Sequence, residues 1–329
     1  MNALVTGGAG FIGSELVRQL EQTGARVRVL DNFSTGRRAN LEGTAAEVVE
    51  ADIRDAAAVR HAIEGIDHVF HLACVGVRRS LHSPREAHEV NASGTLAMLE
   101  AAVAARVARF LHVSTAEVYG AATSVPISES LPTFPATPYG ASKLAGEAYA
   151  RAWYETYGFP VTVIRPFNAY GPRCHHEGDS GEVIPKFLLR AWAGMPVVVF
   201  GDGLQTRDFT YVSDTARGLI AAAKSPATAG GTFNLGSGRE TSILDLARLT
   251  GAAELIHAEP RPGDVRRLVC DASRARDTFG FAPTITLEDG LTRLRQWYEQ
   301  QRVAPEILLR DDVVYNWRCD ASPSQPPLA

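Results

Sequence analysis

Residues 6–13 read TGGAGFIG, and this stretch determines the fold that we expect. It follows a short apolar run at residues 3–5 and leads into a segment of helical periodicity at residues 11–22. Glycines between a strand and a helix allow a tight turn, and they let backbone N–H groups and the helix dipole approach a pyrophosphate. The glycines placed to do this are Gly7, Gly10 and Gly13. An ordinary glycine turn is the alternative.

The next apolar run, VRVLD, ends at Asp31. A carboxylate at the end of this second strand hydrogen-bonds the 2′-hydroxyl of an adenosine ribose and repels a 2′-phosphate, so the pattern favours NAD over NADP. Arg37 and Arg38 follow closely in the sequence and leave NADP open as an alternative.

The composition indicates a globular chain with a small-molecule partner. Of its 329 residues 45% are apolar, and the formal net charge is -4, which gives no basic surface for nucleic acid. No uninterrupted apolar stretch approaches the roughly 20 residues that a membrane span requires, and we find no basic leader before the first strand. We therefore expect a soluble, cytoplasmic protein that binds neither nucleic acid nor a membrane.

Cysteine and histidine spacing gives no metal site. The four cysteines are Cys74, Cys174, Cys270 and Cys319, and no two of them form a CxxC pair. This scatter argues against both a disulfide framework and a zinc cluster. His175 and His176 are adjacent and would be awkward ligands for one metal ion.

Short apolar runs alternate with longer helical patterns, which predicts an α/β fold, a Rossmann-type doubly wound parallel sheet. The expected strands are residues 3–5, 27–30, 47–49, 68–72, 110–113 and 161–165, and the expected helices include 11–22, 139–157, 183–193, 214–223, 243–249 and 287–300. We assign residues 1–171, with parts of 206–236 and 264–281, to a cofactor-binding domain. A smaller, irregular substrate domain takes residues 172–205, 237–263 and 282–315, and residues 316–329 are expected to be a disordered tail.

Residues 138–147 read PYGASKLAGE and place Tyr139 four residues before Lys143. The chain has three lysines against 30 arginines, so a lysine here suggests a chemical role. Residues at i and i+4 share a helix face, and an ammonium beside a phenol lowers the phenol pKa, which predicts that Tyr139 acts as a base. A chance pair on a solvated helix is the alternative.

Several further motifs occur in a fixed order: ADI at 51–53, HLA at 71–73, STAEVYG at 114–120, RPFNAYGPR at 165–173, QTRDFTYVSD at 205–214 and RPGDVRR at 261–267. Together with the glycine stretch and YGASK, they resemble the extended short-chain dehydrogenase/reductase family, and within it the NAD-dependent nucleotide-sugar epimerases and dehydratases. The resemblance covers roughly residues 2 to 300. The last twenty-odd residues match none of these motifs.

The resemblance implies a binding site for NAD and one for a nucleoside-diphosphate sugar. The implied cofactor residues are Gly7, Gly10, Phe11, Ile12, Gly13, Asp31, Asn32, Asp52, Ile53, Leu72, Ala73, Asn91, Tyr139, Lys143 and Pro166. The implied substrate residues are Ser80, Thr115, Asn168, Val183, Phe200, Arg207 and Arg266. Among these, Asn168 and Arg207 would bind the diphosphate, and Arg266 would make a further phosphate or ribose contact.

The implied chemistry is hydride transfer at C4 of the sugar. Tyr139 would take the C4-hydroxyl proton while hydride passes to NAD, and Thr115 would stabilise the developing oxyanion. Ala116, directly after Thr115, is the residue type that makes this position resemble the UDP-glucose 4-epimerases. Glu117 makes the next position resemble the dehydratases and UDP-glucuronate decarboxylases, and by that resemblance it would act at C5 or C6.

Our main prediction is a 4-epimerase of a UDP-linked hexose or hexuronic acid. A 4,6-dehydratase or UDP-glucuronate decarboxylase is the alternative, and a net 4-ketosugar reductase or a non-catalytic sensor comes behind both. The alanine-rich helices expected at residues 89–105 and 139–152 predict a homodimer joined through a four-helix bundle.

Overall fold

The structure is a computed structural model that describes residues 1–178, 180–261 and 263–315. The expected disordered tail and Cys319 lie outside the described residues. No helix within the described ranges is both long enough and apolar enough to cross a membrane.

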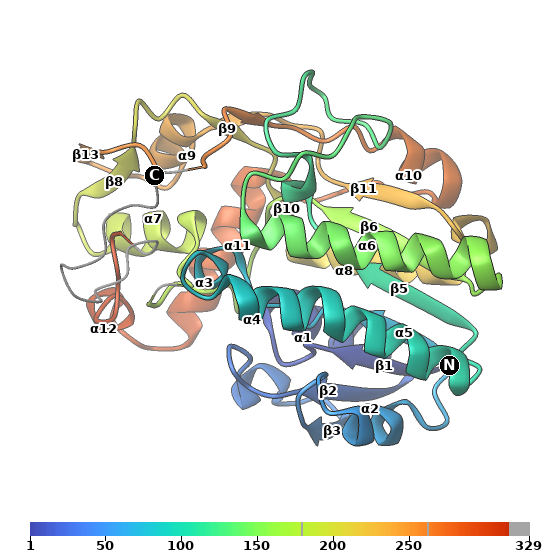
Figure 1. The fold of residues 1–329 in the computed structure, drawn as a ribbon. Helices are drawn as coiled ribbons and strands as arrows, with labels where there is room; N and C mark the ends of the chain where they lie inside the picture. Colours follow the sequence, from blue (N-terminus) through green and yellow to red (C-terminus); the bar gives the residue numbers. More distant parts are fainter. Residues whose placement is uncertain (179, 262, 316–329) are drawn as a thin grey trace.

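A seven-stranded parallel sheet forms the centre of the fold, in the order β11-β6-β5-β4-β1-β2-β3 (Figure 1). Its strands are β1 (Asn2–Thr6), β2 (Arg26–Asp31), β3 (Glu47–Glu50), β4 (His68–His71), β5 (Arg109–Val113), β6 (Val161–Pro166) and β11 (Thr232–Leu235). Strand β1 lies between β2 and β4, so the chain reverses its direction of progress across the sheet there. Ligands bind at such a switch point, beyond the carboxyl ends of the strands. The expected Rossmann fold is confirmed.

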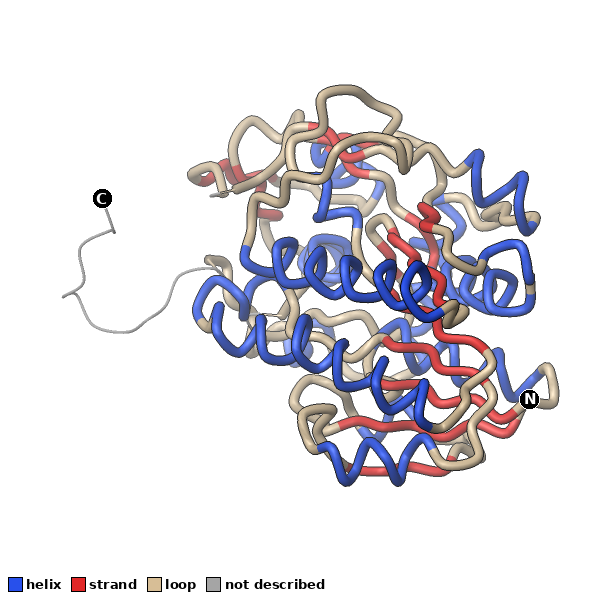
Figure 2. Tube along the Cα trace, turned by 45° about the vertical axis from the view of Figure 1, so that its right-hand side comes forward, coloured by secondary structure: helices blue, strands red, loops and turns tan. Residues whose placement is uncertain are grey.

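Helices cover both faces of this sheet, as the tube view shows (Figure 2). One face packs against α1 (Phe11–Gln22), α8 (Val212–Lys224) and α10 (Ser273–Phe279). The other packs against α2 (Ala56–Ile63), α5 (Gly94–Ala104) and α6 (Pro138–Tyr157). Both layers are apolar on their inner sides, which explains why the sheet strands are rich in Val, Leu and Phe.

The remaining elements are mostly short and complete the fold. They are η1 (Arg38–Leu41), α3 (Val77–His82), α4 (Pro84–His88), η2 (Glu89–Ser93, a π-helical turn), η3 (Ala116–Tyr119), β7 (Ala169–Tyr170), α7 (Val183–Trp192), β8 (Val197–Phe200), β9 (Thr206–Arg207), β10 (Thr210–Tyr211), η4 (Pro226–Thr228), β12 (Thr241–Ser242), α9 (Ile243–Leu249), β13 (Leu255–Ala258), β14 (Arg267–Leu268), α11 (Leu287–Gln300) and α12 (Pro305–Leu308). Strand pairs β8–β13 and β7–β10 and the triplet β12-β9-β14 are separate from the main sheet. A third apolar cluster, built largely from α7, α9 and α11, holds this smaller part together.

A buried ion pair fixes helix α6 to the sheet. Arg165 on β6 donates two hydrogen bonds to the Glu147 carboxylate, at 2.9 and 2.6 Å, and a third to the Tyr119 hydroxyl at 2.8 Å. The Glu147 side chain is 0% exposed and that of Arg165 is 5% exposed. Because Glu147 follows Tyr139 and Lys143 at helical spacing, this pair sets the rotation and height of the helix face that carries all three.

We predict that Arg165→Met destabilises the fold by about 3 kcal/mol or more, because it leaves the Glu147 carboxylate buried without its main partner. Arg151→Ala is the matched control, since Arg151 pairs with the same carboxylate but is 41% exposed, and its loss is expected to cost less than about 1 kcal/mol. Urea unfolding of both variants measures the difference. Equal losses would contradict the role given to Arg165.

Candidate active site

A cavity of about 560 Å³ opens at the carboxyl edge of the main sheet, at the predicted switch point. Most of the residues predicted for the two ligands line it: Gly7, Gly10, Phe11, Ile12, Gly13, Asp31, Asn32, Asp52, Ile53, Leu72, Ala73, Thr115, Glu117, Tyr139, Pro166, Asn168, Val183, Phe200 and Arg207. Four of the predicted residues are not part of its lining, namely Ser80, Asn91, Lys143 and Arg266. One continuous cavity therefore joins the two predicted sites.

The glycine turn between β1 and α1 leaves no room for side chains. Gly7 has φ +69°, and a Cβ there would lie 2.8 Å from the Ala73 nitrogen. A Cβ on Gly13 would lie 2.1 Å from the Gly7 carbonyl oxygen. The turn therefore carries no side chains at these two positions, and its backbone can approach a pyrophosphate closely.

Asp31 ends strand β2 beside this turn. Its carboxylate accepts hydrogen bonds from the backbone of Ala9 at 2.9 Å and of Phe33 at 2.8 Å, and burial raises its pKa. Arg37 is paired with Glu177, and Arg38 is paired with Glu50. The two arginines that could have bound the 2′-phosphate of NADP are thus each paired with a carboxylate. Asp31, in contrast, lines the cavity, and a carboxylate at this place favours NAD.

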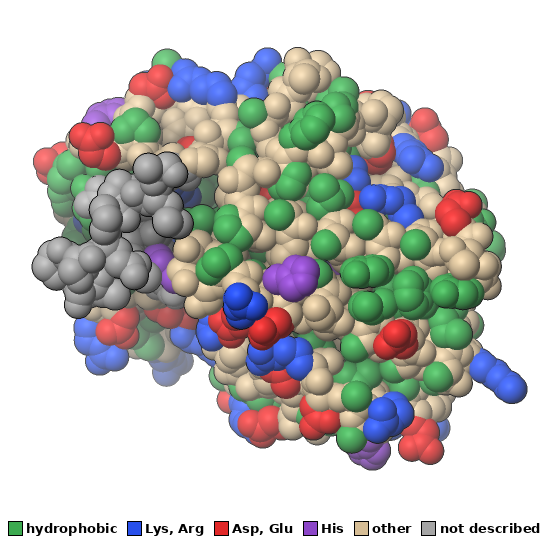
Figure 3. Space-filling view, in the orientation of Figure 1, with side chains coloured by type: hydrophobic (Ala, Val, Ile, Leu, Met, Phe, Trp, Pro, Cys, Tyr) green, Lys and Arg blue, Asp and Glu red, His purple; other side chains and the backbone are tan. Residues whose placement is uncertain are grey.

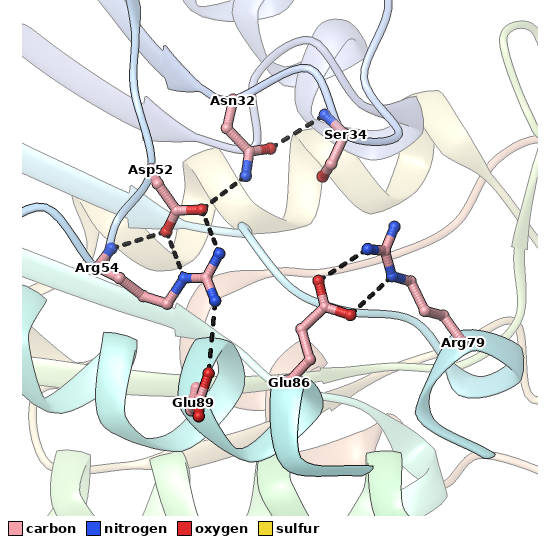
Figure 4. Close-up of polar contacts among 7 residues, drawn as sticks. All are labelled: Asn32, Ser34, Asp52, Arg54, Arg79, Glu86 and Glu89. Carbon is pink, nitrogen blue, oxygen red and sulfur yellow. Dashed lines mark hydrogen bonds and ion pairs between the residues drawn. The ribbon is translucent and has the colours of Figure 1, made fainter. Parts of the chain in front are cut away.

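A network of polar side chains forms the adenosine end of the predicted cofactor site (Figure 4). Asn32 donates to Asp52 at 2.8 Å, and Arg54 donates to both oxygens of Asp52, at 2.9 and 2.8 Å. The hydrogen bond from Arg54 lowers the Asp52 pKa to about 2. Asp52 therefore stays ionised and fixed, and it holds the loop that carries Ile53 against the cavity.

The predicted catalytic residues meet where β5 ends and α6 begins. The Thr137 hydroxyl caps α6 by accepting from the Gly140 nitrogen at 3.1 Å, which fixes the first turn with Tyr139. The Tyr139 side chain lies close enough to Thr115 and Cys74 for both to affect the pKa of its phenol. Thr115 also accepts from the Glu117 nitrogen at 3.2 Å. Tyr139 and Thr115 thus lie together in the lining of one cavity.

One part of the catalytic prediction is wrong. The motif predicts that Lys143 lowers the Tyr139 pKa, but burial raises the pKa of this phenol well above its usual value, and the effect of Thr115, which lowers it, is smaller. The Lys143 ammonium donates to the Val113 carbonyl at 2.7 Å, and burial lowers its pKa. Desolvation outweighs the nearby charge at this depth.

Asn91 lies outside the cavity and positions its wall. It sits on the π-helical turn η2 and is 0% exposed. Its side chain accepts from the Val75 nitrogen at 2.8 Å and donates to the Val75 carbonyl at 3.0 Å and to Ser142 at 2.9 Å. These bonds tie the loop after β4 to helix α6, so Asn91 acts through its neighbours.

The wall opposite the glycine turn is rich in arginine. Arg207 pairs with Asp264 and donates to the Val265 carbonyl at 2.9 Å, and Arg261 lies over the Phe200 ring at 5.2 Å. Arg266, in contrast, pairs with Asp202 at 2.8 Å and is 57% exposed. Within the RPGDVRR motif the predicted ligand is Arg266, yet the arginine of that motif that lines the cavity is Arg261, which the sequence did not indicate.

Ser80 also stays outside the cavity, because its hydroxyl donates to the Val77 carbonyl within α3 at 2.6 Å. Further lining residues were missed in the sequence, among them Cys74, Arg78 and Glu182. They carry no motif of their own, since a lone Cys, Arg or Glu in a loop is unremarkable until the fold turns it inward.

Besides Asp31, two glutamates in the cavity have raised pKa values. Burial raises the Glu117 pKa, and the charge of Arg207 opposes this. Burial also raises the Glu182 pKa to about 7, opposed by Arg78. Burial thus favours the protonated form of both groups, and Glu182, with a pKa of about 7, can carry a proton near neutral pH.

Comparison with known proteins agrees with this geometry. The NAD dependent epimerase/dehydratase family matches residues 3–236. The chain belongs to this family. It is 38% identical to the UDP-glucose 4-epimerase of Mycolicibacterium smegmatis, over 92% of this chain and 99% of that protein. It is 36% identical to the dTDP-glucose 4,6-dehydratase of Streptomyces niveus, over 95% and 97%.

Among solved structures, the dTDP-glucose 4,6-dehydratase of Streptomyces venezuelae, determined with NAD bound, is similar with a TM-score of 0.86 and 35% identity, over 92% of this chain and 98% of that one. This member of the family is accordingly an NAD-dependent enzyme, as the bare glycine turn and Asp31 indicate.

We predict a pH-dependent effect of Glu182→Gln on stability. Because the folded-state pKa of Glu182 is about 7, against an ordinary value of 4.5, the folded protein holds this proton more tightly than the unfolded chain does. Its stabilising effect is complete below pH 4.5 and is lost as the pH rises through 7. The variant should therefore gain melting temperature over the wild type at pH 8 and not at pH 4.5.

Glu306→Gln, at an exposed position, is the control and should show no such pH dependence. The same shift in melting temperature at both pH values for Glu182→Gln would refute the raised pKa.

Proposed function

We propose that this enzyme is a 4-epimerase of a nucleoside-diphosphate hexose or hexuronic acid, UDP-linked, that works through a 4-keto intermediate. Ala116 carries this proposal. It directly follows Thr115, is 2% exposed, and offers no proton, whereas elimination of water requires an acid. A hydride that leaves C4 and returns to the opposite face needs none.

The site residues divide the work of the first step. The phenolate of Tyr139 accepts the proton of the C4 hydroxyl, and Thr115, which lies close enough to Tyr139 to lower its pKa, donates to the same oxygen as charge develops on it. Only the phenolate form of Tyr139 can accept this proton, so Tyr139 must have lost its own proton before the step begins. Lys143, fully buried one helical turn beyond Tyr139, supplies a positive charge that stabilises this phenolate against the burial that favours the phenol. NAD, held by the glycine turn and Asp31, supplies the hydride acceptor. Arg207 and Arg261 hold the diphosphate through planar, bidentate contacts.

A lyase is the second candidate, and Glu117 is the observation that favours it. This carboxyl group lines the cavity two residues after Thr115, and burial raises its pKa. A protonated Glu117 could donate to a leaving hydroxyl, and its conjugate base could remove the C5 proton. The similarity to an epimerase and to a dehydratase is nearly equal, so chemistry has to separate the two.

We also propose a homodimer joined through α5 and α6, which lie side by side on one face (Figure 1). Hydrophobic side chains gather over this region (Figure 3). Val103, Tyr149 and Tyr157 are 41%, 38% and 65% exposed. Two copies of this face would form a four-helix bundle. Light scattering at micromolar concentration should give twice the monomer mass, and a monomer would refute the assembly.

We predict that Tyr139→Phe and Lys143→Met each reduce turnover of UDP-glucose or the true substrate by about 10²–10⁴-fold, the usual contribution of general-base catalysis. Binding of the nucleoside diphosphate should persist, because neither side chain lies at the arginine-rich wall. Tyr149→Phe, an exposed tyrosine on the same helix, is the control and should keep full activity. Near-normal turnover in Tyr139→Phe would remove the proposed base.

Turnover in deuterium oxide separates the two candidates, with UDP-glucose and dTDP-glucose as trial substrates. Epimerisation breaks only the C4–H bond and returns the same hydrogen, so the product should gain no deuterium and keep its mass. Glu117→Gln should then retain substantial activity. Deuterium at C5 or C6, loss of water or carbon dioxide, or collapse of activity in Glu117→Gln would favour the lyase.

A further inference from the structure

The described part of the chain ends in a segment, residues 309–315, that returns to the cavity after α12. Leu309 is 7% exposed and packs in the apolar cluster around α7. The Gly178 nitrogen donates to the Asp311 carbonyl at 2.8 Å. The segment is thus anchored to the smaller part of the fold.

Asp312 provides the strongest anchor. One of its carboxylate oxygens lies 2.8 Å from the Lys186 ammonium, and the other lies 2.7 Å from the Arg190 guanidinium. Lys186 also donates to the Val313 carbonyl at 2.6 Å. The Asp312 side chain is only 7% exposed, and Lys186 and Arg190 are 13% and 14% exposed. Shielded ion pairs of this kind hold position better than surface pairs do.

The anchored segment faces the same cavity as the cofactor and substrate residues. Asp312 and Val314 line the cavity together with Lys186, Arg190 and Phe200. Tyr315 lies against Phe200, with ring centroids 6.0 Å apart. Since Arg261 lies over the same Phe200 ring, the segment meets the cavity next to the arginine-rich wall, at the end lined by Val183.

We propose that residues 312–315 form one wall of the nucleoside-binding end of the substrate site, and that the ion pairs of Asp312 with Lys186 and Arg190 hold this wall in place. The ligand class is a nucleoside diphosphate, so the inference rests on the proposed function. Val314 gives the wall its apolar contact with the base, and Tyr315 supports Phe200 from outside. Asp312 is a positioning residue, because it acts on the nucleotide through the segment that it anchors.

The test titrates UDP and dTDP into the purified holoenzyme by calorimetry. Asp312→Asn removes the charge of the anchor, and Val314→Asp alters the wall itself and leaves the anchor intact. Each should weaken nucleoside-diphosphate binding about fivefold to tenfold, raise KM in parallel, and leave kcat and the content of bound NAD unchanged. The matched controls are Asp311→Asn, whose only ion pair among the described residues is with Arg310 at the surface, and Ile307→Asp, at a side chain on α12 that is 60% exposed. Both should bind as the wild type does.

Unchanged binding in Asp312→Asn and Val314→Asp would overturn the inference and leave the proposed function standing. Tighter binding in Asp312→Asn would also overturn it, because Asp312 would then be competing with the diphosphate for Lys186 and Arg190. A wild-type enzyme that binds neither UDP nor dTDP would instead count against the proposed function, and this inference would fall with it.

Discussion

The buried pair between Glu147 and Arg165 is the contact on which the geometry of the active site depends. It joins α6 to β6 at a position where both side chains are almost completely shielded. Tyr139, Lys143 and Glu147 recur every four residues along one face of α6, so fixing Glu147 also fixes the other two. Lys143 then reaches the Val113 carbonyl at the end of β5, two residues before Thr115. The ion pair between Glu147 and Arg165 thereby positions Tyr139 relative to Thr115.

The sequence predicted the fold closely because its strongest signals are local. The glycine turn, the apolar runs and the helical periodicities placed α1, α9 and α11 at their observed bounds, and placed the first six sheet strands to within one or two residues. Strand β11 was not foreseen. It is four residues long, lies between Gly231 and Gly236, and includes the polar Asn234, which becomes acceptable only because Tyr119 and the Ile127 carbonyl satisfy its side chain.

The candidate site was predicted in outline for a similar reason. Motif residues such as Thr115 and Tyr139 come together where the strands end, as a parallel sheet requires. Burial and side-chain pairing could not be read from the sequence: the raised pKa of Tyr139, the inward turn of Glu182, and the choice of Arg261 over Arg266 all depend on tertiary packing. Two lysines illustrate the difference. Lys143 belongs to a motif that the sequence reveals, whereas no motif marks Lys186, and only the structure shows that it pairs with Asp312 near the end of the described chain.

The central claim is that hydride leaves C4 of a nucleotide sugar for bound NAD and returns to the same carbon. Turnover of UDP-glucose that carries deuterium at C4, followed by NMR of the product, tests this most directly. The account predicts a slower reaction with the labelled substrate and a product that keeps the deuterium at C4 with inverted configuration. Deuterium found at C6, or an unlabelled product, would contradict it.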